Sequence, residues 1–160
     1  MALFDAEEYS PSRARRLFPL IAIIAIVLAV SGGALSWFYR YWPEEHVVNK
    51  FFVALERKDF DAAYGIYFSD PDWKQHPAKY SQYSLPLFMR DWGTSSQYGA
   101  VVSHKIECAT EPPKKGAHSS SGVLVVVNVN DKFQTMLWVE KKDKIIGIAP
   151  PLWDVRCRAL

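Results

Sequence analysis

The sequence has 160 residues, of which 49% are hydrophobic and 14% aromatic, and this composition excludes disorder over most of its length. From Glu44 to Leu160, 15 Lys and Arg face 14 Asp and Glu, a net charge of +1. This balance excludes the basic surface of a typical nucleic-acid-binding protein, and we expect no nucleic-acid partner. The length suits one domain, because two independent cores would not fit in about 117 residues.

A long apolar run near the N-terminus predicts a transmembrane helix. Residues Leu17–Tyr39 include no charged side chain. A helix of this length spans roughly 35 Å, more than the ~30 Å hydrocarbon core of a bilayer. We therefore expect a tail (1–16), a transmembrane helix (17–39), a short linker (40–43) and a domain (44–160).

Basic residues flank this run unequally. Arg13, Arg15 and Arg16 lie just before it, and Arg40 alone lies just after it. The positive-inside rule then places the N-terminus in the cytoplasm and the C-terminal domain outside it. We expect a single-pass protein of the bacterial inner membrane, in contact with the lipid bilayer through this helix.

Aromatic residues at the end of the run favour an uncleaved anchor. Trp37, Tyr39 and Trp42 match the aromatic belt of a membrane-spanning helix at the headgroup level. The Arg-rich start and the small residues near positions 29–36 are also typical of a cleaved signal peptide, so that alternative stays open.

Three helices are predicted between Pro43 and Gly93. The first starts at Pro43, which suits a first turn, and its apolar stripe ends at Leu55. Asp59 is placed to cap the second helix and Ser84 to cap the third, which Gly93 is placed to stop. The second and third helices are expected at 60–67 and 85–92, with an irregular polar stretch at 72–82 between them.

The pattern then changes to β-strands. The Asn130-Asp131 pair is a good tight turn between two runs rich in β-branched residues. Helices followed by a meander of strands predict an α+β domain, with three helices packed on one face of an antiparallel sheet of about four strands. The expected strands are Ala100–Ala109, Val123–Val129, Phe133–Glu140 and Ile145–Ala149.

One motif resembles a known family. The run Phe51-Phe52-x-Ala54-Leu55-x-x-x-Asp59-Phe60-x-x-Ala63-Tyr64, followed by Trp92-Gly93 and the meander, is similar to the nuclear transport factor 2-like superfamily. Within it, the chain resembles the small bacterial single-pass membrane-anchored members of unassigned function. The resemblance implies a cone, in which a curved sheet wraps three helices and leaves a pocket at its open end. Members include enzymes, ligand binders and assembly parts, so this fold does not indicate the activity.

Candidate catalytic residues are few. The four histidines are not spaced as metal ligands, and no nucleotide or nucleophile motif occurs, so we expect no cofactor, no metal and no catalytic residues. Asp72 and His76, in the irregular stretch, are the one pair considered for acid–base chemistry. We expect both to be dispensable for stability and to do no chemistry. Five residues are candidates to line the cone pocket, with a place in the core as the alternative for the aromatic ones: Tyr64, Tyr67, Trp73, His76 and Trp92.

Two cysteines, Cys108 and Cys157, form no CxxC motif. In an oxidising compartment they could form one structural disulfide, and two unrelated thiols are the alternative.

The function predicted from these features is that of a membrane-tethered, non-enzymatic binding or assembly module of the bacterial cell envelope, with another envelope protein as partner. The alternative is a small-ligand-binding or hydrolytic domain that uses the cone pocket.

Overall fold

The computed structural model describes residues 13–111, 121–149 and 157. The chain forms two compact units, Met1–Arg40 and Tyr41–Leu160, and each is described here by itself.

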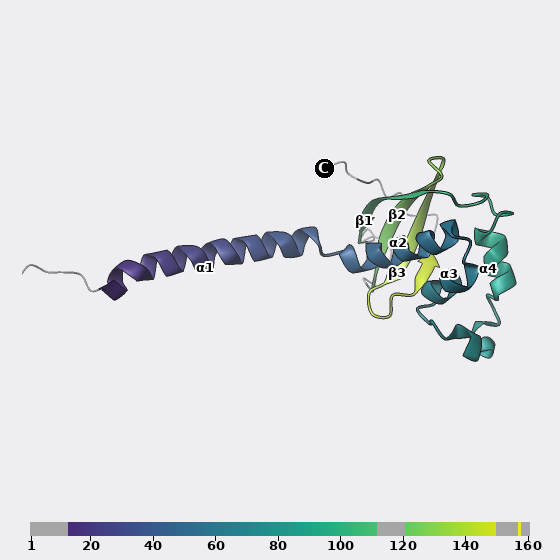
Figure 1. The fold of residues 1–160 in the computed structure, drawn as a ribbon, viewed down its shortest axis with the longest axis horizontal. Coiled ribbons are helices and arrows are strands. Elements are labelled where there is room, and N and C mark those ends of the chain that lie inside the picture. The colour runs from purple at the N-terminus through teal and green to yellow at the C-terminus, as the bar shows by residue number, and fades with distance from the viewer. Residues whose placement is uncertain (1–12, 112–120, 150–156, 158–160) are drawn as a thin grey trace, which may run out of the picture. The chain divides into compact units, whose positions relative to one another are not determined.

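The first unit contains helix α1 (Arg13–Phe38), drawn in purple and blue in Figure 1. Its apolar side chains are exposed from Leu20 to Phe38. Among the described residues there is one helix long and apolar enough to cross a membrane, and it lies near the N-terminus. This is compatible with a single-pass membrane protein.

The second unit begins with helices. Ser84, predicted to cap the helix at 85–92, lies at the cap position but makes no capping side-chain hydrogen bond, whereas the predicted cap Asp59 does. Asp59 caps α3 (Phe60–Tyr67), because its side chain accepts a hydrogen bond from the Ala62 N–H over 3.0 Å. The first helix of this unit, α2 (Trp42–Glu56), starts at Trp42, one residue before the predicted start at Pro43 and within the segment expected as a linker. The helices are α2 (Trp42–Glu56), α3 (Phe60–Tyr67), the short 3₁₀ helices η1 (Trp73–Gln75) and η2 (Pro77–Tyr80), and α4 (Leu85–Trp92).

The strands form one open antiparallel sheet in the order β1-β2-β3-β4, so the predicted α+β class is confirmed. Asn130 and Asp131 both adopt positive φ angles, 55° and 54°, in the turn between β2 and β3. This is the conformation that a tight hairpin turn requires. The strands are β1 (His104–Thr110), β2 (Gly122–Val129), β3 (Phe133–Glu140) and β4 (Ile146–Ile148).

Strand β1 begins four residues later than the sequence predicted. The Asn130 side chain occupies the place of a neighbouring strand: its Oδ1 accepts from the N–H groups of Val102 and Ser103, and its Nδ2 donates to the carbonyl of Ala100. These bonds satisfy the N–H groups of Val102 and Ser103 and the carbonyl of Ala100 without a strand partner. The last strand is also shorter than expected, at three residues.

The core lies between the helices and one face of the sheet. In Figure 1, α2 runs across the sheet, and it contacts β1, β2 and β3. Alternate residues of β2 supply the apolar face: Val123, Val125, Val127 and Val129, all fully buried. The helices contribute mainly aromatic rings to this core, so it is filled by bulky side chains.

The opposite face of β2 is also buried. Leu124 and Val126 point away from the helices and yet are 0% exposed. Cys108, which is paired with Val126 in the sheet, lies on this second face and is joined by a disulfide to Cys157, with 5.7 Å between their Cα atoms. The bond ties residue 157, near the C-terminus, to the outer side of the sheet.

Candidate functional site

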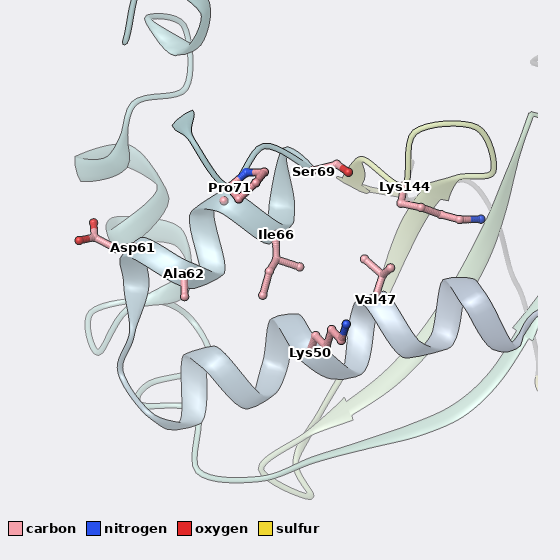
Figure 2. Close-up of a pocket in the computed structure, with 9 residues that line it drawn as sticks. Val47, Lys50, Asp61, Ala62, Ile66, Ser69, Pro71 and Lys144 are labelled. Atoms are coloured by element: carbon pink, nitrogen blue, oxygen red, sulfur yellow. The ribbon is translucent and has the colours of Figure 1, made fainter. Parts of the chain in front are cut away.

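A groove with a volume of about 470 Å³ lies between α2 and α3. Figure 2 shows Val47 and Lys50 rising from α2, and Ala62 and Ile66 pointing toward α2 from α3. Ser69 and Pro71, beyond the end of α3, and Lys144, in the turn between β3 and β4, complete the rim. The volume falls in the range of about 300–1,000 Å³ that is typical of ligand sites.

The groove has an apolar interior because the apolar stripes of both helices extend beyond the core. Val48 is fully buried, whereas its neighbour Val47 is half-buried and faces the groove. On α3, Ala63 is fully buried, whereas Ala62 is exposed and Ile66 half-buried. The signal for a groove in the sequence was the width of these stripes.

The charged side chains on the rim of the groove differ in whether they have an ion-pair partner. Lys50 makes no hydrogen bond or ion pair with any residue that the structure describes. Lys144 donates to Oε1 of Glu44 over 2.5 Å, and this partner is only 4% exposed. At the other end Asp61 forms an ion pair with Lys74, with 2.6 Å between Nζ and Oδ2. Lys50 is therefore the charge on the rim that no described residue compensates.

A second polar cluster is centred on Asp70, which follows α3. Its Oδ2 accepts a hydrogen bond from the Tyr80 hydroxyl over 2.5 Å and lies 3.2 Å from Nδ1 of His76. Its Oδ1 accepts from the backbone N–H of Asp72 over 3.1 Å. The Tyr80 hydroxyl is the main cause that holds the pKa of Asp70 below its ordinary value, with His76 and the Asp72 N–H adding to it. His76 thus faces Asp70 and not Asp72, and the cluster holds the loop together.

A buried histidine was missed by the sequence analysis. Nδ1 of His104 lies 2.7 Å from Oε1 of Glu56, and Nε2 lies 3.0 Å from Oδ1 of Asn49. The ring stacks on Phe52 with 5.2 Å between centroids, and the His104 side chain is 9% exposed. Both partners are on α2, so this group links the start of β1 to that helix. Its partners lie 48 and 55 residues away, so no local pattern pointed to it.

The five residues predicted to line a cone pocket are not brought together at one cavity in the described structure. Tyr64, Tyr67 and Trp92 are 1%, 8% and 2% exposed and belong to the core. Trp92 also borders a shallow groove of about 290 Å³ beside α4. Trp73 is half-buried against Tyr64, with 4.6 Å between ring centroids, and His76 is exposed in the loop.

Tyr83, which lies just before α4, has a perturbed pKa. The Tyr83 hydroxyl donates a hydrogen bond to Oδ2 of Asp91 over 3.0 Å. Burial, followed by the Asp91 carboxylate, raises the pKa of Tyr83 well above its ordinary value. Tyr83 therefore stays protonated and acts as a donor, so it is unsuited to serve as a general base.

The predicted membrane anchors fall in both units. Trp37 and Tyr39 are exposed in the first unit. Trp42 lies in α2, is 53% exposed and stacks on His46 with 4.9 Å between ring centroids. The side chains of the three arginines before the span, Arg13, Arg15 and Arg16, lie outside the described residues.

Comparison with known proteins does not add a relative. No protein-family model, no curated protein and no solved structure matches the chain.

Proposed function

We propose that the chain is a membrane-tethered, non-enzymatic binding or assembly module of the bacterial cell envelope, and that the α2–α3 groove is its binding site. One observation carries this proposal: an apolar groove open to solvent, with Val47 and Ile66 on its walls and the charge of Lys50 on its rim. Exposed apolar concavities of this kind mark interaction sites. The partner would be another envelope protein.

The apolar helix α1 supports the tether in this proposal. A domain held by such a helix is restricted to the neighbourhood of the bilayer, which raises its effective concentration for other membrane-bound proteins. The arginines before the helix favour an N-terminus in the cytoplasm and a domain outside it, in the inner membrane.

The polar clusters support binding over catalysis. Asp70 receives hydrogen bonds from its own loop, and His104 is buried between Glu56 and Asn49. Neither cluster opens into the α2–α3 groove. A catalytic acid–base pair acts on a substrate held beside it, and the α2–α3 groove, which could hold one, is lined by neither cluster.

The alternative function, a small-ligand or hydrolytic site inside a cone, has weaker support. The resemblance to the nuclear transport factor 2-like superfamily would place such a site between the helices and the sheet. Aromatic rings occupy much of that space here: Phe51 and Phe52 are 0% exposed, and each contacts Trp92 edge-on. A core filled in this way leaves the surface groove as the better binding site.

Crosslinking in intact membranes tests the proposal. The full-length chain would carry a photoreactive amino acid at Ala62, inside the groove, or at Lys132, in the β2–β3 turn, as the matched control. We expect one discrete adduct with another envelope protein from position 62 and not from position 132. Equal adducts from both positions, or none from position 62, would contradict a binding role for the groove.

A reporter that is active only outside the cytoplasm tests the topology. Fused after Leu160, it should be active, and the full-length mass should remain in the membrane fraction. Activity of a cytoplasmic reporter alone would contradict the predicted orientation. A mature form beginning near Gly32 or Trp37 would support the signal-peptide alternative.

A further inference from the structure

We propose that the α2–α3 groove binds an amphipathic α-helix of a partner protein, which places an apolar stripe between the two helices and an acidic side chain against Lys50. This inference rests on the proposed function and specifies the chemistry of its partner. It follows from the spacing of the groove residues, from the charge on the rim and from the open shape of the groove.

The spacing of the lining residues fits a third helix. Val47 and Lys50 are three residues apart on α2, and Ala62 and Ile66 are four apart on α3. Such rows form the ridges between which the side chains of a packing helix insert. An apolar stripe at i, i+3, i+4 and i+7 is the pattern with which amphipathic helices dock into grooves.

The charges around the groove select an acidic partner. Lys144 already faces the buried carboxylate of Glu44, and Asp61 is paired with Lys74. Lys50 remains as a cation at the edge of an apolar surface, without a described partner. A Glu or Asp beside the apolar stripe of the partner would complete this pair, whereas a Lys there would be repelled.

The open shape favours a protein helix over a lipid chain. The groove is bordered by exposed residues such as Ala62 and Pro71 and is not enclosed. An alkyl chain extracted from a bilayer would keep much of its surface in water there and would gain little from the transfer. A partner helix covers the groove with its own backbone and leaves its polar face in solvent.

A designed peptide tests this chemistry directly. The probe is a fluorescently labelled helical peptide of about 18 residues, with a Leu stripe flanked by Glu, and its match carries Lys in place of each Glu. The full chain is embedded in nanodiscs of zwitterionic phosphatidylcholine, and empty nanodiscs give the background. We expect the Glu peptide to bind at least about tenfold more tightly than the Lys peptide.

Two groove variants and two matched controls make the result specific. Lys50→Glu should reverse the preference, so that the Lys peptide binds more tightly than the Glu peptide. Ala62→Gln, which puts a long neutral side chain into the groove, should weaken both peptides. Both residues are exposed, so these changes leave the fold intact, which circular dichroism checks. The controls, Lys132→Glu and Ala100→Gln, make the same changes at exposed positions outside the groove and should bind as the wild type does.

Several results would overturn the inference. These are no binding of the Glu peptide above background, equal binding by groove and control variants, and self-association of the chain that Lys50→Glu abolishes. The last would make a second copy the occupant. Binding of phosphatidylglycerol vesicles by the detergent-solubilised chain, lost in Lys50→Glu and without peptide binding, would assign the groove to an anionic lipid instead.

Failure here is distinguishable from failure of the proposed function. If the crosslink at Ala62 to an envelope protein persists while the peptide does not bind, the module stands and the acidic-helix chemistry is wrong. If no envelope protein is crosslinked and the peptide does bind with the expected charge preference, the groove chemistry stands and the envelope partner is wrong.

Discussion

The hydroxyl of Tyr80 donates a hydrogen bond to Oδ2 of Asp70 over 2.5 Å, and this contact joins η2 to the end of α3. A donor to the ionised carboxylate favours the charged form, which lowers the pKa of Asp70 below its ordinary value of 3.8. The stabilisation is therefore fully present above about pH 4 and is lost as the pH falls through the lowered pKa of the folded state.

Tyr80→Phe should raise the pKa of Asp70, because it removes the largest cause of the shift. The measurement is an NMR titration of the Asp70 carboxyl carbon in the full chain in micelles. Tyr83→Phe is the matched control, since the Tyr83 hydroxyl donates to Asp91 and not to Asp70. An Asp70 titration that Tyr80→Phe leaves unchanged would show that the contact is not made in solution.

The core position of Trp92 predicts a large loss of stability on truncation. The ring is 2% exposed and packs edge-on against Phe51, with 5.1 Å between centroids. Trp92→Ala should lower the free energy of unfolding by about 3–5 kcal/mol. Trp42→Ala, at a side chain that is 53% exposed, should change it by about 0.5 kcal/mol or less. Urea unfolding of the full chain in mild detergent, followed by near-UV circular dichroism, compares them, and a cost below about 1 kcal/mol at Trp92 would show that the ring is not packed in solution.

Local signals in the sequence were enough for most of the elements. The expected range of β3, Phe133–Glu140, matches the structure because alternating apolar residues and the Asn130-Asp131 turn fix both its face and its start. Asp59 is the cap of α3 for a similarly local reason, a side chain that reaches a backbone N–H three residues ahead. The start of β1 was misplaced because its limit is set by the distant Asn130 side chain.

The candidate site depends on contacts that the sequence does not display. Val47 and Ile66 continue apolar stripes that also enter the core, so their place on a groove depends on how α2 and α3 pack. Lys144 is 100 residues from its partner Glu44, and no periodicity predicts such a pair. The contacts of His104 could not be predicted either, because both of its partners lie on a different element.

Gly93 ends α4 for a reason different from the one expected. It was predicted as the C-terminal stop of the helix, a position where glycine is commonly left-handed. Its φ and ψ are −86° and −168°, an extended conformation that any residue adopts. A Cβ at this position would lie 2.3 Å from the carbonyl oxygen of Met89, to which the Gly93 N–H donates over 2.7 Å. The glycine is needed for close approach to the helix backbone.

This difference separates Gly93 from Gly99, whose φ is +67° and which has open space around it. Asn tolerates the left-handed region, so Gly99→Asn should be nearly neutral. Gly93→Asn should cost about 1–3 kcal/mol, because the backbone of α4 must shift to admit any Cβ. Thermal unfolding of the two variants in the same detergent measures these costs. It thereby tests whether Gly93 is needed for close approach and Gly99 only for its positive φ. A neutral Gly93→Asn and a costly Gly99→Asn would reverse this assignment.

The disulfide between Cys108 and Cys157 predicts both a chemical state and a stability. Thiol labelling of the denatured, unreduced chain should detect no free thiol, and a non-reducing gel should show no dimer. The bond closes a loop across 49 positions of sequence, and its reduction should lower the free energy of unfolding by about 2–4 kcal/mol. Two free thiols per chain would contradict the bond.

The same bond also reports on the compartment. Disulfides persist in oxidising compartments and are rare in the bacterial cytoplasm, so the bond is consistent with a domain outside the inner membrane. A chain that begins at Tyr41 and is retained in the cytoplasm should carry free thiols at Cys108 and Cys157, whereas the full-length chain in membranes should carry none. The double variant Cys108→Ser/Cys157→Ser is the control, because a reducing agent should not change its stability. Free thiols in the membrane-bound chain would contradict the orientation that the three arginines predict.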